Sequence, residues 1–282
     1  MANLYDPDQM FMDFFRSTQE ALSLLEVLFG VDGACDQVLG GGPPAAQQQS
    51  LLASPAWGTL TRLREYALLG RLGGRETQDI VIDGANVLAL VTTENVRPEE
   101  SWRRILAMAD ARSGLDNGDP VELGRVALLA NVDVRTVRNA VSSGELLSTK
   151  EGGLQFIDNA SARRWLAGRR GFKPTEVDDG SLTLAVGSVA TPVQFAALLA
   201  SRRKDLALDA RDSKLVVLHP AVSPPALAKL EAGVFSLPLD AVFPVADFYQ
   251  LPRKEFLACV MRVFFRAELD ALVGLASPKE AA

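Results

Sequence analysis

Cysteine and histidine are nearly absent: the 282 residues include two cysteines and one histidine. Cys35 and Cys259 lie far apart in apolar surroundings, which favours reduced thiols in a cytoplasmic protein over a disulfide framework. A single histidine, His219, argues against a classical zinc site, which needs several histidine or cysteine ligands. We therefore expect a cytoplasmic protein without a metal or other cofactor.

Long hydrophobic runs are also missing. The first residues are acidic and lead into no apolar core of the kind that a signal peptide carries. The most apolar later run is interrupted by Arg262 and Arg266, whose charges oppose burial in lipid. These features predict that the protein neither enters nor crosses a membrane.

Basic residues are fewer than acidic ones. The chain has 29 lysines and arginines and 35 aspartates and glutamates, which gives a net charge of −6. This balance excludes a strongly basic architectural protein. However, residues 120–173 hold nine basic and five acidic side chains, a local +4, and the rest of the chain carries −10. With 48% hydrophobic residues, the length suits two or three folded domains, one of them locally basic.

The stretch from Val121 to Arg170 predicts a helix, a tight turn, a second helix, a hairpin and a third helix. Ala127, Asn131 and Val137 have the spacing at which two short helices pack across a turn of three or four residues. Ala127 is small enough for close approach, and Asn131 tolerates a left-handed backbone. Asp133 is the expected N-cap of the second helix.

The second helix is predicted to be amphipathic. Its inward stripe at helical spacing consists of Val134, Val137, Ala140 and Val141. The outward face carries the candidate base-reading residues Arg135, Thr136, Arg138, Asn139 and Ser142. In a major groove, arginine pairs with the two acceptors of guanine and asparagine with the donor and acceptor of adenine. The alternative is an ordinary solvated face.

A hairpin follows the second helix. Residues 145–150 and 154–157 alternate around Glu151-Gly152-Gly153, a pattern typical of two strands joined by a tight turn. Asp158 or Asn159 is expected to cap the last helix.

This order resembles the winged helix-turn-helix of excisionase and MerR-like proteins, in which a phrase like "SGELL…GG…F…" and a helix ending in "WL", here Trp165-Leu166, close the domain. The resemblance implies double-stranded DNA as the partner, residues 134–141 as the recognition helix and residues 150–155 as the wing. The side chains expected to hold phosphates are Lys150, Arg163, Arg164, Arg169, Arg170 and Lys173. Glu145 and Glu151 depart from the family, whose wing is commonly basic.

The first 118 residues predict a mostly helical domain. One long amphipathic helix is expected within residues 1–39, with aromatic side chains that suit core packing or, alternatively, dimerisation. A turn at Gly40–Pro44 precedes a further helical segment over residues 47–69. Pro98, Glu99 and Glu100 signal another helix, and Gly114–Pro120 is a predicted polar linker.

Residues 79–91, DIVIDGANVLALV, form the one enzyme-like phrase. A buried strand that ends in an aspartate followed by Gly and Asn resembles the opening of PIN-like and NYN ribonucleases, where carboxylates hold a divalent metal. Asp83 would be the first ligand. About thirty residues separate this segment from the helix-turn-helix, too few for the rest of such a sheet, so we expect Asp83 in a turn or cap and no catalytic residue.

Residues 181–282 predict a third, helical domain. Residues 181–189 suit a short strand, and Thr191-Pro192 begins a helix. The phrase around Leu230-Glu231 and Gly233 resembles the second half of Cro and repressor-like (XRE) domains. Pro224-Pro225-Ala226 stands where that family places polar base readers, so the resemblance implies a degenerate relative used for self-association. A plain helical domain is the alternative.

The last helix of this domain is expected to bury its apolar side chains against the domain itself or against a second subunit. These side chains are Phe264, Phe265, Leu269 and Leu272.

The sequence therefore predicts a mainly α protein with domains at residues 1–118, 119–174 and 181–282. Its function would be that of a transcription regulator that binds duplex DNA with sequence preference, and not of an enzyme. A homodimer is expected because one short recognition helix contacts few bases. Three alternatives stay open: an excisionase-like recombination factor, an interaction adaptor without DNA binding, and a metal-dependent nuclease.

Overall fold

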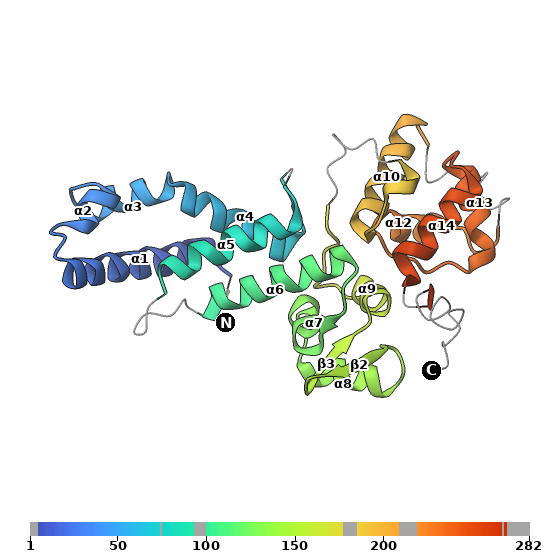
Figure 1. Ribbon diagram of the computed structural model, residues 1–282, viewed down its shortest axis with the longest axis horizontal. Helices are drawn as coiled ribbons and strands as arrows, with labels where there is room; N and C mark the ends of the chain where they lie inside the picture. The colour runs from blue at the N-terminus through green and yellow to red at the C-terminus, as the bar shows by residue number, and fades with distance from the viewer. Residues whose placement is uncertain are drawn as a thin grey trace, which may run out of the picture. The chain divides into compact units, whose positions relative to one another are not determined.

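A computed structural model of the protein describes residues 5–73, 75–92, 100–176, 185–208, 219–266 and 268–269. The chain is mainly helical with one small antiparallel sheet, which confirms the predicted class (Figure 1). None of the described helices has the length and apolarity needed to cross a membrane. The chain divides into two compact units, residues 1–113 and 114–282. The division of the second unit into two separate domains stays a prediction.

The first unit is a set of packed helices. They are α1 (Pro7–Phe29), α2 (Ala34–Leu39), α3 (Pro44–Leu52), α4 (Pro55–Leu69), α5 (Thr77–Leu90) and most of α6 (Glu100–Asn117). Their core is aromatic: the ring of Trp57 meets Phe11 at 5.0 Å and Trp102 at 6.0 Å, both edge-on. Trp102 Nε1 donates to Met10 O at 3.0 Å. Phe11, Phe14 and Phe15 of α1 are buried, so core packing is their role, whereas Phe29 at the end of α1 is exposed.

Two predicted helices are each divided in the structure. The helix expected within residues 1–39 ends at Gly30, whose φ is 65°, and α2 begins only after Gly33. Glycine adopts this left-handed backbone at little cost, so Gly30 ends α1 although the apolar pattern continues. The segment 47–69 is divided because Ser54 and Pro55 provide an N-cap and a first-turn proline for α4. Pro98 and Glu99 lie outside the described residues.

Residues 79–90 are helical, so the strand that underlies the nuclease resemblance is absent from this described segment. Asp83 lies in the middle of α5 and pairs with Arg75, and its expected role in a turn or cap is therefore wrong. No three His, Cys, Asp or Glu side chains among the described residues are grouped to hold a metal ion. Gly84 has a packing role instead: a Cβ there would lie 2.7 Å from Leu63 Cδ2.

Gly84→Ala is expected to lower the free energy of unfolding of the full-length protein by about 1–2 kcal/mol. The added methyl overpacks the α4–α5 contact against Leu63, which is fully buried, and this cost exceeds the gain of about 1 kcal/mol in helix propensity. Gly58→Ala is the matched control, because its nearest neighbour is Arg62 Nη1 at 3.8 Å. Chemical denaturation should show Gly58→Ala neutral or stabilising; equal losses in the two variants would contradict the packing role.

The second unit begins with the end of α6 and a region that contains the only sheet among the described residues. Its elements are β1 (Val121–Glu122), α7 (Leu123–Ala130), α8 (Val134–Ser142), β2 (Ser148–Glu151), β3 (Leu154–Ile157) and α9 (Asn159–Ala167). The strand order is β1-β3-β2, all antiparallel. Val121 and Ser148 both pair with Ile157, so β3 is the central strand.

The remaining described elements of this unit are η1 (Val186–Ser188), α10 (Pro192–Asp205), α12 (Pro224–Glu231), η2 (Leu239–Ala241), α13 (Val242–Phe248) and α14 (Arg253–Phe264). Thr191 caps α10 with Gln194 as its capping-box partner, as the Thr-Pro phrase predicts. The strand expected at residues 181–189 is a 3-10 turn where it is described; residues 181–184 and Leu272 lie outside the described residues.

Apolar side chains of α10, α12, α13 and α14 share one core. Phe195, Phe256 and Phe264 are joined by ring contacts at 5.0 and 5.6 Å. Cys259 is buried in this core, and burial raises the pKa of its thiol to about 11. Both cysteines are free thiols.

Candidate nucleic-acid interface

The turn between α7 and α8 has the geometry that the sequence predicts. Asn131 adopts the left-handed conformation, with φ 52° and ψ 49°. Asp133 caps α8, since its Oδ1 accepts the N–H of Arg135 at 2.7 Å. Val137 is fully buried and Ala127 is 2% exposed. The two helices therefore pack closely, and the orientation of α8 is fixed by its neighbour.

The outer face of α8 holds all the candidate base-reading residues. Their side chains are exposed: Arg135, Thr136, Arg138, Asn139 and Ser142. Val137 and Ala140 on the opposite face are buried. Among the described residues, neither Arg135 nor Arg138 has an ion-pair partner. This face therefore presents arginine and asparagine donors that can meet an external group.

The hairpin β2–β3 is confirmed, and its turn is Gly152-Gly153. Both glycines have positive φ, 57° and 83°, as a two-residue hairpin turn of this kind requires. Lys150 is exposed and lies opposite Gln155. It is the one basic side chain of the two strands, and the exposed Glu151 follows it directly.

The segment after α9 lies against the α7–α8 turn. A Cβ on Gly171 would be 3.0 Å from Ala130 O and 3.2 Å from Asn131 Cβ, so the glycine permits this close approach. Arg170 precedes Gly171 and is exposed. The backbone next to Arg170 is thereby placed beside the α7–α8 turn.

The other basic residues expected to hold phosphates differ in their surroundings. Arg164 and Lys173 are exposed. Arg169 is half-buried and stacks on Trp165, with its Cζ 3.9 Å from the ring. Such stacking constrains the guanidinium while leaving its edge donors usable.

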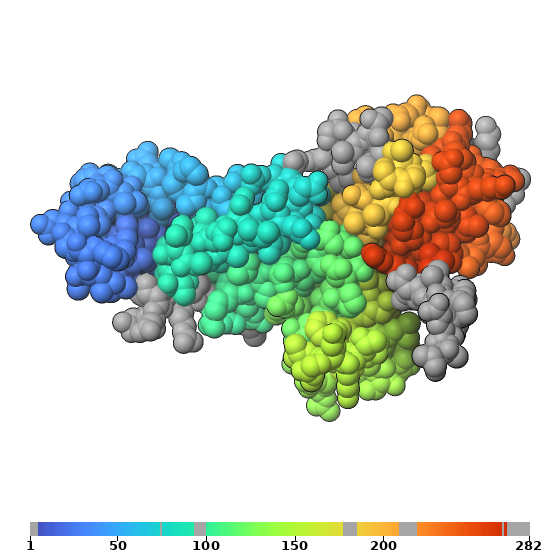
Figure 2. Space-filling view, in the orientation of Figure 1, coloured from blue at the N-terminus to red at the C-terminus, as the bar shows by residue number. Residues whose placement is uncertain are grey.

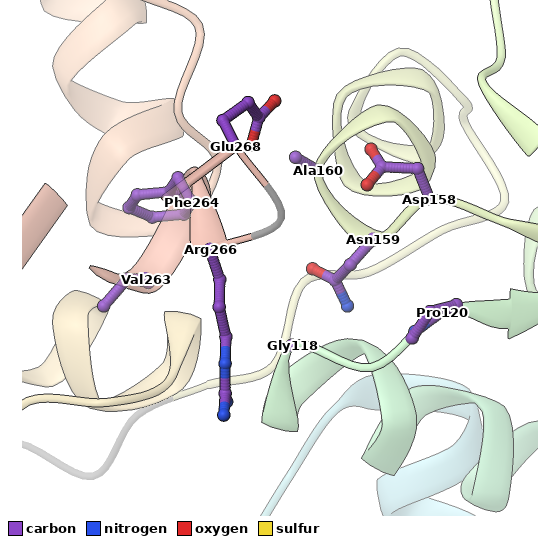
Figure 3. Close-up of a pocket in the computed structure, with 9 residues that line it drawn as sticks. All are labelled: Gly118, Pro120, Asp158, Asn159, Ala160, Val263, Phe264, Arg266 and Glu268. Carbon is purple, nitrogen blue, oxygen red and sulfur yellow. The ribbon is translucent and has the colours of Figure 1, made fainter. Parts of the chain in front are cut away.

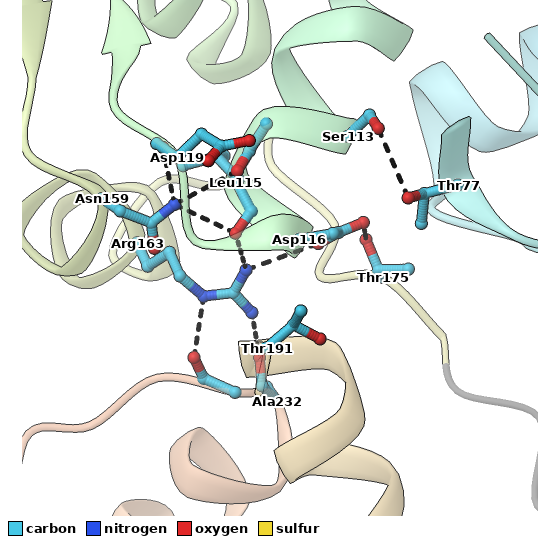
Figure 4. Close-up of polar contacts among 12 residues, drawn as sticks. Thr77, Ser113, Leu115, Asp116, Asp119, Asn159, Arg163, Thr175, Thr191 and Ala232 are labelled. Atoms are coloured by element: carbon cyan, nitrogen blue, oxygen red, sulfur yellow. Dashed lines mark hydrogen bonds and ion pairs between the residues drawn. The ribbon is translucent and has the colours of Figure 1, made fainter. Parts of the chain in front are cut away.

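The prediction that Arg163 holds a phosphate is wrong. Arg163 is 6% exposed, and its guanidinium points into the protein, where it joins α9 to the loop after α12 (Figure 4). Its Nε donates to Gly233 O at 2.7 Å and its Nη2 to Ala232 O at 2.9 Å. Its Nη1 reaches Leu115 O at 3.1 Å and Asp116 Oδ1 at 3.4 Å. A guanidinium that is used in this way is not available to DNA.

The contacts of Asp116 and of Asn159 in this polar cluster were not predicted from the sequence. Residues 114–120 were expected to form a linker, but α6 continues to Asn117 because Leu115 and Asp116 are buried. Asp116 Oδ2 accepts the hydroxyl of Thr175 at 2.7 Å. Asn159 donates to the carbonyls of Leu115 at 3.0 Å and Asp119 at 2.9 Å. Local sequence carries no signal for these contacts, except that Asn and Asp are unusual beside apolar helix positions.

A cavity of about 220 Å³ lies between the start of α9 and the end of α14 (Figure 3). Asp158 and Asn159 line it from α9, and Phe264 and Arg266 line it from the other side. Asp158 already caps α9 through the N–H of Ser161 at 2.8 Å, and the Asn159 amide is used within the cluster described above. The polar groups of Asp158 and Asn159 therefore serve the fold, and we assign no ligand to this pocket.

No protein-family model matches this sequence, and neither a curated protein nor a solved structure is significantly similar to it. The likeness of residues 121–170 to winged helix-turn-helix proteins rests on the residues quoted for it. Function must therefore be argued from the chemistry of the interface itself.

Proposed function

We propose that residues 119–174 form a winged helix-turn-helix that binds double-stranded DNA with sequence preference. The observation that carries this proposal is the outer face of α8. Arg135, Arg138 and Asn139 are exposed there, and the arginines have no ion-pair partner among the described residues. A plain solvated helix gains by pairing its arginines with acids at a spacing of three or four, and α8 contains no acid.

The side chains of α8 match the chemistry of base edges in a major groove. Arg135 and Arg138 can each present two parallel donors to the O6 and N7 of guanine. Asn139 can pair its amide with the N6 and N7 of adenine. Because Val137 and Ala140 anchor the opposite face, the readers are presented by a rigid element.

Basic side chains around α8 supply contacts to the phosphates. Arg170 is held near the α7–α8 turn by Gly171, and Lys150 projects from the hairpin that takes the place of the wing. Arg164 and Lys173 extend the exposed basic set. Such contacts fix the position of a protein on DNA without reading sequence, so they complement the α8 face.

The biological role that we propose is transcription regulation by a homodimer. Two recognition helices related by symmetry double the bases that are read, which one short helix needs for useful discrimination. The C-terminal region, residues 181–282, is the proposed site of self-association.

Selection of bound duplexes from random DNA, followed by gel shift at several salt concentrations, tests this proposal. We expect an enriched DNA sequence that the protein binds at least about a thousandfold more tightly than random DNA. The logarithm of affinity should fall linearly with the logarithm of salt, with a slope of about −0.9 for each phosphate contacted. An absence of both enrichment and salt-sensitive affinity would favour the adaptor alternative.

A further inference from the structure

The apolar stripe of α1 runs from a buried part of the helix into an exposed end. Ala21, Leu25, Leu28 and Phe29 follow one face at helical spacing. Ala21 is 9% exposed, whereas Leu28 is 64% and Phe29 72% exposed. The stripe therefore changes from buried to exposed within about two turns of one helix. Figure 2 shows the surface of this N-terminal part of the chain in blue.

This exposed end, which we call the apolar tip, includes more than the stripe. Its members are Leu25, Val27, Leu28, Phe29 and Val31, all at least 40% exposed. Val27 is the most exposed of them, at 81%. Adjacent large apolar side chains at such exposure are uncommon on a surface that meets only water, and they mark sites of interaction.

The charged residues of the segment that holds the apolar tip all have one sign. Residues 17–61 contain no lysine, arginine or histidine, but they contain the four acids Glu20, Glu26, Asp32 and Asp36. The α2 helix brings Asp36 to this region, since the N–H of Cys35 donates to Glu26 Oε1 at 3.4 Å. The segment that holds the apolar tip thus carries only negative charges.

This charge pattern selects among possible occupants. A second copy of the chain would bring two sets of four carboxylates together, which opposes association. Anionic membrane surfaces are repelled in the same way, since helices that lie on membranes carry lysine and arginine. A segment with apolar side chains and positive charges satisfies both the exposed stripe and the acids around it.

We propose that the apolar tip of α1 is a docking site for a basic amphipathic helix of another protein. The apolar residues of the partner helix cover Leu25, Leu28 and Phe29, and the lysines or arginines of the partner helix face the carboxylates. This site lies in the first unit and is independent of the proposed DNA interface, so each can fail while the other stands.

Two synthetic peptides of about four helical turns test the proposal with the full-length protein. Both have leucines at helical spacing; one has lysine and the other glutamate at the remaining positions. Fluorescence anisotropy should show binding of the lysine peptide only. The double variant Leu28→Ser, Phe29→Ser should bind it at least about tenfold more weakly. Ile82→Ser, Leu90→Ser is the matched control, because both side chains are more than half exposed on α5.

Neutralising the acids tests the contribution of charge to peptide binding separately from that of apolar contact. Glu20→Gln with Asp32→Asn should weaken binding of the lysine peptide and reduce its dependence on salt. Equal binding by the serine double variant and the wild type would overturn the proposal. So would a concentration-dependent dimer in sedimentation that Leu28→Ser, Phe29→Ser abolishes and the α5 control retains, because the occupant would then be a second copy.

Discussion

Arg163→Met is expected to lower the free energy of unfolding of the second unit by about 3–5 kcal/mol, the usual cost of removing one partner of a buried ion pair. The substitution removes the ion pair between Arg163 and Asp116, whose side chain is buried. It also removes the hydrogen bonds that Arg163 donates to the carbonyls of Ala232 and Gly233, and one of those that the Leu115 carbonyl accepts. Chemical denaturation of the full-length protein, followed by circular dichroism, measures the loss.

Arg164→Met is the matched control, because Arg164 is the next residue of α9 and is exposed. Its effect on unfolding should stay within about 0.5 kcal/mol. Gly233→Ala approaches the cluster from the opposite side: its Cβ would lie 2.5 Å from Arg163 Nη2 and 2.6 Å from Pro192 O, and its φ is 69°. It should destabilise the same unit. Similar losses for Arg163→Met and Arg164→Met would show that the buried cluster contributes little.

The elements around the candidate interface follow from signals that are local in sequence. Asn131 and Asp133 determine the turn and the start of α8, and Gly152-Gly153 determines the hairpin. Each acts on its own backbone or on an amide two or three residues away. Such effects need no knowledge of the rest of the fold, which is why sequence alone predicts them.

The strand interpretation of residues 79–91 fails for a different reason. A short apolar run is compatible with a buried strand or a buried helix segment, and periodicity does not separate the two. Packing decides: Gly84 lies against Leu63 of α4, and that neighbour is known only from the fold. The glycine of the enzyme-like phrase is thus explained by a helix–helix contact.

Arg163 shows why some residues of the candidate site could not be assigned from the sequence. In sequence, Arg163 and Arg164 are equivalent, adjacent arginines on a helix near a basic segment. In the fold, one is buried against residues near positions 116 and 233 and the other is exposed. The difference depends on partners far away in the chain, so local patterns assign the same role to both residues.

The second large effect that we expect is a loss of DNA binding when residues on the outer face of α8 are replaced. Arg135→Ala and Arg138→Ala should each reduce binding of a selected DNA site by about 1–3 kcal/mol and affect random DNA little, so the double variant should lose most of its sequence preference. Both side chains are exposed, so neither substitution should alter stability beyond about 0.5 kcal/mol. Binding isotherms with selected and random duplexes measure the two affinities.

Arg170→Ala is the informative comparison, because it removes a charge near the α7–α8 turn without changing α8. A phosphate contact carries no sequence information, so this variant should weaken selected and random DNA about equally. It should also flatten the salt dependence by about 0.9 in slope. Arg163→Met cannot serve for this comparison, since its guanidinium holds the fold together. If Arg135→Ala and Arg138→Ala leave both affinity and preference unchanged in a folded protein, α8 is not a recognition helix, and the proposed DNA interface loses the observation on which it rests.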